Sequence, residues 1–208
     1  PPADPAEIAT LWPGTPPRGA GVAPVLQIDD HSTDLAHSHN RTAIGIAIPQ
    51  MFVFRPAQPD GSALLVIPGG GYHNEWFDGE GYDVARHFNR VGVTCFVLRY
   101  RLPAEGWADR GDVPLQDAQR AIRLIRAGAA KYGIDPARVG VMGFSAGGHV
   151  AGSLSTRWDA KVYAPIDAAD SQETRPAFAG LIYPVITMET GTDGGSRDHL
   201  LGPSPSEA

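Results

Sequence analysis

The stretch Gly143–Gly147, GFSAG, holds a serine between two glycines. An apolar run beginning at Val139 precedes it, and small and apolar residues follow it at helical spacing. The pattern G-x-S-x-G between a buried strand and a helix is typical of a serine on a sharp turn, with its hydroxyl exposed above the sheet. We therefore predict that Ser145 is a catalytic nucleophile. The alternative is a helix-capping serine whose neighbouring glycines serve only packing.

A second glycine cluster, Pro68–His73 (PGGGYH), follows the apolar run ALLVI and precedes a helical pattern. Acyl transfer needs N–H donors directed at a developing oxyanion, and a glycine run lets the backbone approach it closely. We expect the amides of Gly70 and Gly71, together with that of Ala146 after the serine, to form an oxyanion hole. A phosphate-binding loop is a poorer interpretation, because neither GK[ST] nor G-x-G-x-x-G spacing is present.

Three side chains close to this loop are candidates for substrate binding: Tyr72, His73 and Trp76. Tyr72 and His73 follow the glycines directly, and sugar rings pack on aromatic faces such as that of Trp76. Packing of the tryptophan within a loop is an equally good interpretation.

The base and the acid that a serine nucleophile needs are hard to find in the sequence. His149 lies one turn after Ser145 on the same predicted helix, so its ring should face packing or substrate space. His199 stands beside Asp198, which cannot readily orient it, and we interpret it as a surface or packing residue. The sequence offers three further carboxyl groups as candidates for the acid that orients the base: Asp167, Asp170 and Asp193.

The elements that must position these residues alternate along the chain. Four apolar strand patterns lie near residues 62–67, 93–100, 139–142 and 178–186, with helical patterns between them. This alternation predicts an α/β fold with a mostly parallel sheet and helices on both faces. Ligands bind beyond the carboxyl ends of the strands in such sheets, and both glycine clusters fall there. Residues 42–57 predict one or two edge strands.

We divide the chain of 208 residues into an extended Pro-rich arm with a polar loop, residues 1–40, and one domain, residues 41–208. The 17 basic residues are scattered and the net charge is −6, so no nucleic-acid partner is expected. No apolar run spans a membrane. Cys95 lies in a buried-strand pattern and is expected in the core.

The three histidines His31, His37 and His39 have loose spacing and no framing strand or helix, which favours a solvated loop over a metal site. We expect no metal and no cofactor.

Several motifs together resemble one family: VIPGGGY, FVLRYRLP, PLQDAQRAIRLIR, IDPARVGVMGFSAGGHVAGSL and SRDHLLGPSPS. Over Asn40–Ser206 the chain is similar to α/β-hydrolases of the bacterial acetylxylan and feruloyl esterase group, with Pro68 in place of the usual histidine. The resemblance implies a three-layer α/β/α sandwich and a serine carboxylesterase that removes acetyl or feruloyl groups from plant cell-wall polysaccharide.

The resemblance also implies that the triad Asp and His follow later strands than those found here. We therefore expect the C-terminal part of the domain to be missing from this chain, with a remainder of the same protein as the partner that carries both residues. The opening PPADPAEI, without Met, suggests a processed protein, secreted or periplasmic.

Other hypotheses stay open at this point. A peptidase or an arylformamidase would use the same fold, and a non-catalytic carbohydrate-binding fragment would need no triad. The carboxyl groups of Glu75, Asp78 and Glu80 suggest a glycosidase, but that hypothesis leaves the serine turn unexplained. We interpret these acids as stabilisers of a helix N-terminus. Asp117 is expected to bind loop backbone or a nearby arginine.

Overall fold

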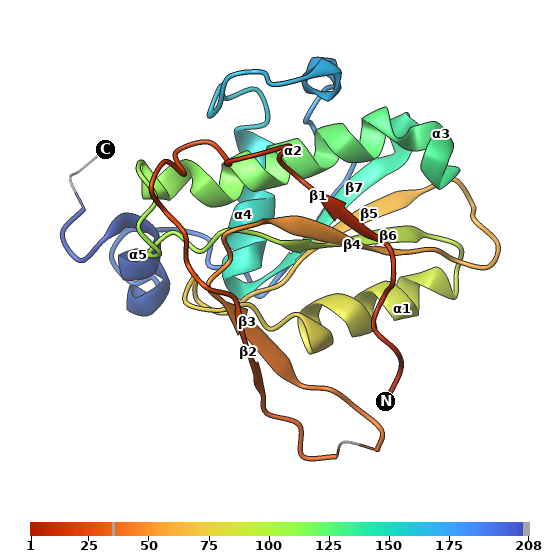
Figure 1. The fold of residues 1–208 in the computed structure, drawn as a ribbon, viewed down its shortest axis with the longest axis horizontal. Helices are drawn as coiled ribbons and strands as arrows, with labels where there is room; N and C mark the ends of the chain where they lie inside the picture. The colour runs from red at the N-terminus through yellow and green to blue at the C-terminus, as the bar shows by residue number, and fades with distance from the viewer. Residues whose placement is uncertain (35, 206–208) are drawn as a thin grey trace.

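A six-stranded sheet forms the centre of the computed structural model, which describes residues 1–34 and 36–205 (Figure 1). The strand order is β1-β4-β6-β5-β7-β8. The strands are β1 (Ile8–Thr10), β4 (Gln50–Phe54), β5 (Ala63–Ile67), β6 (Thr94–Arg99), β7 (Val139–Phe144) and β8 (Ala179–Ile182). The pairs β6–β5, β5–β7 and β7–β8 are parallel, whereas β1 and β4 pair antiparallel at one edge. The predicted mostly parallel sheet is confirmed.

Helices cover both faces of this sheet and make it the middle layer of three. On one face, α1 packs in a core cluster with inward side chains of β4, β5 and β6. On the other face, α2 and α4 pack on the alternate side chains of the same strands. The helices are α1 (Asp83–Asn89), α2 (Val113–Ala127), α3 (Ala129–Tyr132), α4 (Ser145–Thr156) and α5 (Gly194–Leu201). Shorter helical turns are η1 (Asp78–Tyr82), η2 (Arg110–Asp112), η3 (Pro136–Arg138) and η4 (Ala168–Ser171).

The central strands are mostly apolar because both of their faces are covered, with Thr94 and Arg99 at the two ends of β6 as exceptions. All five residues of β5 and all six of β6 are buried. Cys95 lies in β6 as predicted, and burial raises the pKa of its thiol to about 12. The thiol therefore stays protonated at neutral pH, and Cys95 is a core residue.

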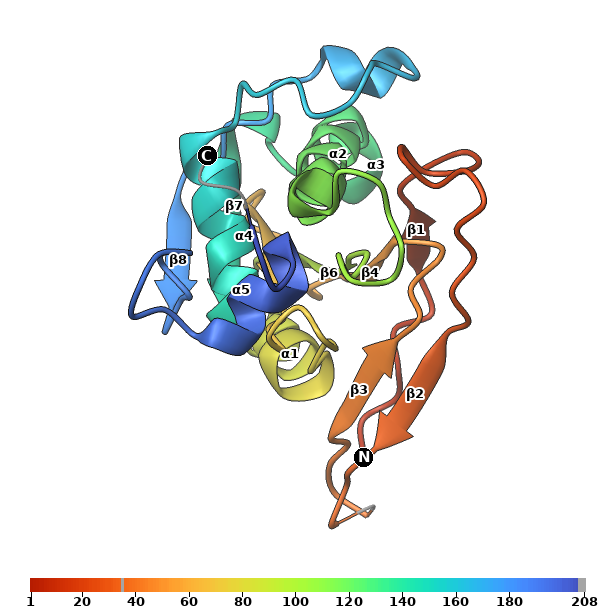
Figure 2. The ribbon, with the colours of Figure 1, turned by 90° about the vertical axis from the view of Figure 1, so that its left-hand side faces the viewer.

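The N-terminal arm contains more structure than the sequence suggested. Its β1 strand pairs with β4 in the main sheet, and Leu11 and Trp12 are buried in the core. Strand β2 (Gln27–Asp30) pairs with β3 (Arg41–Ile44) in a separate two-stranded sheet that projects from the main body (Figure 2). The division of the chain at residue 40 stays a prediction. The arm does more than lie on the surface, because one of its segments is a strand of the main sheet and two of its side chains enter the core.

Two predicted strands have other neighbours or another degree of burial than the sequence led us to expect. Strand β4 was expected at an edge, but it lies between β1 and β6, because the arm supplies the edge strand. Strand β8 was expected to be buried, yet its residues alternate between exposed and half-buried, because it is the outermost strand of the parallel side. Ser206, where the family resemblance ends, lies outside the described residues. No helix of the described part of the chain has the length and apolar character needed to cross a membrane.

The start of α2 is fixed by a buried ion pair. Arg101 and Asp117 both have fully buried side chains, with the guanidinium Nη2 2.8 Å from Oδ1 of the carboxylate. Asp117 also accepts hydrogen bonds from the backbone N–H of Arg101 and from the indole N–H of Trp12. The predicted role of Asp117 in binding arginine and loop backbone is confirmed, and this contact holds the arm and the loop after β6 against α2.

Candidate active site

Ser145 lies at the junction of β7 and α4 with a left-handed backbone, φ 49°. Few residues other than glycine adopt this conformation, and it persists only where the surroundings impose it. The glycines on both sides allow the turn, because neither position has room for a side chain. A Cβ on Gly143 would lie 2.1 Å from the carbonyl oxygen of Gly147, and one on Gly147 would lie 2.2 Å from that of Ile67. Ser145 itself is half-buried, so solvent and ligand can reach this residue.

The glycine loop after β5 lies against this turn. β5 and β7 are adjacent parallel strands with Ile67 opposite Gly143, so the segments that follow them meet at one edge of the sheet. A Cβ on Gly69 would lie 2.9 Å from the Cβ of Ser145. The structure thus brings together the two glycine clusters that the sequence predicted to share a site.

The loop has unpaired amides near the serine. Gly70 (φ 135°) and Gly71 (φ 63°) adopt backbone conformations that favour glycine. Within the described residues, the N–H groups of both make no hydrogen bond, whereas the N–H of Gly69 donates to Glu80. Ala146 lies in the first turn of α4, where helical N–H groups have no partner within the helix. These three amides are available to an anionic oxygen, as an oxyanion hole requires.

The buried Tyr72 and the half-buried His149 form a pair beside the loop. The phenol oxygen of Tyr72 lies 2.7 Å from Nδ1 of His149. Burial raises the pKa of Tyr72 well above its usual range and lowers the pKa of His149. Both groups are therefore neutral at pH 7, and His149 directs a ring nitrogen to Tyr72, in line with the expectation that it faces packing or substrate space.

His199 contacts the glycine loop, which the interpretation as a surface or packing residue did not anticipate. Its Nδ1 lies 3.0 Å from the carbonyl oxygen of Gly71. Its ring also lies near the exposed ring of His73, with a centroid distance of 5.1 Å. Sequence reasoning missed this contact because the two partners lie 128 positions apart.

The carboxyl groups considered as triad acids have structural partners. Asp167 and Asp170 both form ion pairs with Arg120 on α2. Asp193 caps α5 by accepting the N–H of Ser196. The described residues therefore show no aspartate–histidine pair directed at Ser145.

The three acids near the loop each have hydrogen-bond partners within the protein. Glu75 is fully buried and accepts the N–H of Tyr100, and Asp78 pairs with Arg41. Glu80 accepts hydrogen bonds from Gly69 and from the hydroxyl of Tyr183. Asp78 and Glu80 also lie in the first turn of η1, as expected for stabilisers of a helix N-terminus, whereas Glu75 lies before it. The use of these acids in such contacts does not favour a glycosidase.

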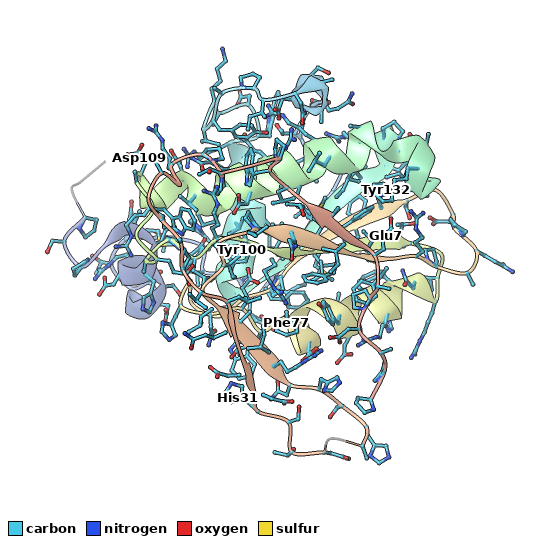
Figure 3. The ribbon with its side chains drawn as sticks, in the orientation of Figure 1. Glu7, His31, Phe77, Tyr100, Asp109 and Tyr132 are labelled. Carbon is cyan, nitrogen blue, oxygen red and sulfur yellow. The ribbon has the colours of Figure 1, made fainter. Side chains whose placement is uncertain are left out.

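A cavity of about 460 Å³ opens beside the Tyr72–His149 pair. Its wall combines apolar side chains with a polar rim that includes Asp109, which lies near the start of α2 (Figure 3). The lining residues include Tyr72, Asp109, Leu115, His149, Met188 and Leu200. Of the three predicted substrate contacts, only Tyr72 lines this cavity.

The other two predicted contacts, His73 and Trp76, do not line this cavity, and their contact with substrate stays a prediction. Trp76 is half-buried and packs against His31 of the β2–β3 segment, with ring centroids 5.1 Å apart, and His73 is exposed. His31 also bonds Thr42, and His37 lies 2.8 Å from Asp34, so these histidines have partners within their own segment.

The lowered pKa of His149 predicts a pH dependence of stability. In the unfolded chain this ring binds a proton near its ordinary pKa of about 6.5, but the folded protein resists that protonation. The free energy of unfolding should therefore decrease as the pH falls below that value, until the folded ring is protonated too. Urea unfolding at pH 7 and pH 5 should show a smaller decrease for His149→Gln than for the wild type. Equal decreases in the free energy of unfolding for the wild type and His149→Gln would contradict a lowered pKa of His149 in the folded protein.

Comparison with known proteins agrees with this architecture. The BD-FAE family profile matches residues 51–176, more than half of the chain. An acetylxylan esterase of Xylanibacter ruminicola is 38% identical over 142 residues, which cover 67% of this chain and 26% of that protein. The endo-1,4-beta-xylanase B of Butyrivibrio fibrisolvens is 40% identical over 144 residues, 69% of this chain and 22% of that protein. The chain thus spans about a quarter of the length of these curated relatives.

Solved structures show the same fold. An acetyl ester-xyloside bifunctional hydrolase from Caldicellulosiruptor lactoaceticus superposes with a TM-score of 0.72 at 30% identity, covering 98% of this chain and 66% of that one. A thermophilic esterase of Thermogutta terrifontis superposes with a TM-score of 0.58 at 25% identity, covering 70% of this chain and 52% of that one. With its sheet topology, its serine turn and these similarities, the chain belongs to the BD-FAE family of the α/β-hydrolase fold.

Proposed function

We propose that this chain carries the nucleophile and the oxyanion hole of a serine carboxylesterase. The observation that carries the proposal is the left-handed Ser145 packed against a loop whose Gly70 and Gly71 amides are unpaired. A serine held only as a helix cap would need neither the strained backbone nor free donors from a neighbouring loop.

The reaction follows from this arrangement. The Ser145 oxygen attacks the ester carbonyl carbon, and its proton passes to a general base. The carbonyl oxygen becomes an oxyanion, which accepts hydrogen bonds from Gly70, Gly71 and Ala146. The intermediate collapses as the C–O bond to the alcohol breaks and the alcohol takes up the proton. Water then attacks the acyl-enzyme and releases the acid, restoring Ser145.

The general base and its orienting acid are proposed to come from a further segment of the protein. In this fold the triad follows the order serine, acid, histidine. Within the described residues, neither His149 nor His199 forms a hydrogen bond with the Ser145 hydroxyl, which supports a base from elsewhere. The partner in catalysis is thus an Asp–His pair contributed by the same polypeptide.

The substrate we propose is an acetyl or feruloyl ester on plant cell-wall polysaccharide. Support comes from the relatives, which include an acetylxylan esterase and a xylanase. The mixed wall of the cavity suits a ring with hydroxyl groups on an apolar frame. Since a polymeric substrate cannot enter a cell, we also propose that the protein acts in secreted or periplasmic form.

A substrate comparison on the full-length protein tests this function. Acetate or ferulate release from acylated xylan oligosaccharides is expected, with much slower cleavage of peptide anilides and of N-formylkynurenine. Preferred hydrolysis of an amide substrate would assign a peptidase or an arylformamidase instead. Binding of the oligosaccharide without ester cleavage would show a non-catalytic binding protein.

A further inference from the structure

The glycine loop is held in place by a carboxyl group that lies outside it. Oε2 of Glu80 accepts the N–H of Gly69 at 2.8 Å, and Oε1 accepts the hydroxyl of Tyr183 at 2.7 Å. The two partners belong to different segments, one after β5 and the other after β8. One side chain therefore joins two loops that border the Ser145 turn.

The loop after β8 is in turn attached to the serine residue. The N–H of Val185 donates to the carbonyl oxygen of Ser145 at 3.0 Å. Pro184 lies so close to α4 that a Cβ on Gly148 would be 2.8 Å from the Cβ of this proline. Tyr183 has a left-handed backbone, φ 34°, and its ring packs against that of Phe144 with a centroid distance of 5.9 Å.

Glu80 itself is held firmly. It lies in the π-helical turn η1, a type of turn that occurs frequently at functional sites. Asp78 in the same turn forms an ion pair with Arg41 at 2.8 Å, and a Cβ on Gly81 would lie 2.7 Å from a methyl group of Val97. Burial and the adjacent carboxyl group of Glu80 raise the pKa of Tyr183 to about 12, so its hydroxyl retains the proton that it donates.

These contacts form a closed path from Ser145 through the loop after β8 and Glu80 to Gly69, which returns to Ser145. We propose that Glu80 is a positioning residue, which fixes the distance between the glycine loop and the serine by binding Gly69 and Tyr183 together. The inference rests on the proposed function of Ser145. Because Glu80 accepts the N–H of Gly69, the unpaired amides that this loop offers to an oxyanion are those of Gly70 and Gly71.

The test compares Glu80→Ala with Glu80→Gln in the full-length enzyme, using an acetyl ester. Alanine removes both contacts, and displacement of a catalytic group by about 1 Å can cost on the order of 10²-fold in rate. We expect a decrease of that size in kcat with little change in KM. Glutamine can present its oxygen to Gly69 and its amide to the Tyr183 oxygen, so it should restore most of the kcat.

Asp83→Ala is the matched control, because Asp83 is a nearby exposed carboxyl group that pairs with Arg86 and should leave kcat unchanged. A Glu80→Ala enzyme with normal kcat and only a lower Tm would overturn the proposal, as would a Glu80→Gln enzyme as slow as Glu80→Ala. If Glu80→Ala does not fold, Tyr183→Phe takes its place, because it removes only the hydrogen bond from the Tyr183 hydroxyl to Glu80. An unchanged kcat of Tyr183→Phe would then overturn the proposal. Ser145→Ala in the same series separates the two hypotheses: full activity there refutes the proposed function itself.

Discussion

Ser145→Ala is expected to abolish ester hydrolysis by the full-length protein, with a loss on the order of 10⁶-fold in kcat, as found when a triad serine is removed. Ser145 lies on the strained turn packed against the loop whose Gly70 and Gly71 amides are unpaired, and alanine removes its oxygen without altering the turn. The Tm should therefore stay close to that of the wild type. Initial rates with an aryl acetate measure the effect.

Ser155→Ala provides the control for this variant. Ser155 lies on the same helix, but its hydroxyl donates to the carbonyl of Ala151 at 2.7 Å and takes no part in the site. Its activity should match the wild type. If Ser145→Ala kept the wild-type rate, the nucleophile would have to be another residue.

Gly147→Ala should have the largest effect on stability. Its Cβ would lie 2.2 Å from the carbonyl oxygen of Ile67 and 2.4 Å from that of Pro68, and both are backbone atoms that cannot rotate away. Overpacking of this kind costs about 1–3 kcal/mol or more in the free energy of unfolding. Movement of the Ile67 and Pro68 backbone away from the new methyl group would also displace the glycine loop, so the esterase activity should fall as well. Urea unfolding measures the loss of stability, and the ester assay measures the loss of activity.

Gly152→Ala is the matched substitution on the same helix. The nearest atom to its Cβ would be a methyl group of Leu181 at 3.8 Å, which is ordinary contact. Alanine should stabilise the helix there by about 0.5–1 kcal/mol. If the two variants unfolded at the same urea concentration, close packing of α4 on the glycine loop would be refuted.

Much of the site is predictable from local sequence. The turn at Ser145 follows from glycine spacing between a strand and a helix, and the position of Gly70 and Gly71 follows from a glycine run after a buried strand. The rule that ligands bind at the carboxyl ends of parallel strands then brings the two together. Each of the two turns is predicted from residues that are close in the chain, and only the general rule on parallel sheets joins them.

The contacts that sequence analysis missed join residues that are distant in the chain. Glu80 and Tyr183 lie 103 positions apart, and no local pattern marks one as the partner of the other. The pairing of β1 with β4 was missed because a proline-rich arm of mixed polarity gives no strand periodicity, although Leu11 and Trp12 enter the core. The packing of Trp76 against His31 was missed for the same reason, and its contact with substrate stays a prediction.

Covalent labelling tests the central claim most directly. The full-length protein should react with a fluorophosphonate, and peptide mass spectrometry should locate a single adduct on Ser145, because its turn lies against the loop with the unpaired amides of Gly70 and Gly71. Prior incubation with a competing ester should slow the labelling. An adduct on another residue, or an active enzyme that resists labelling at Ser145, would contradict the account.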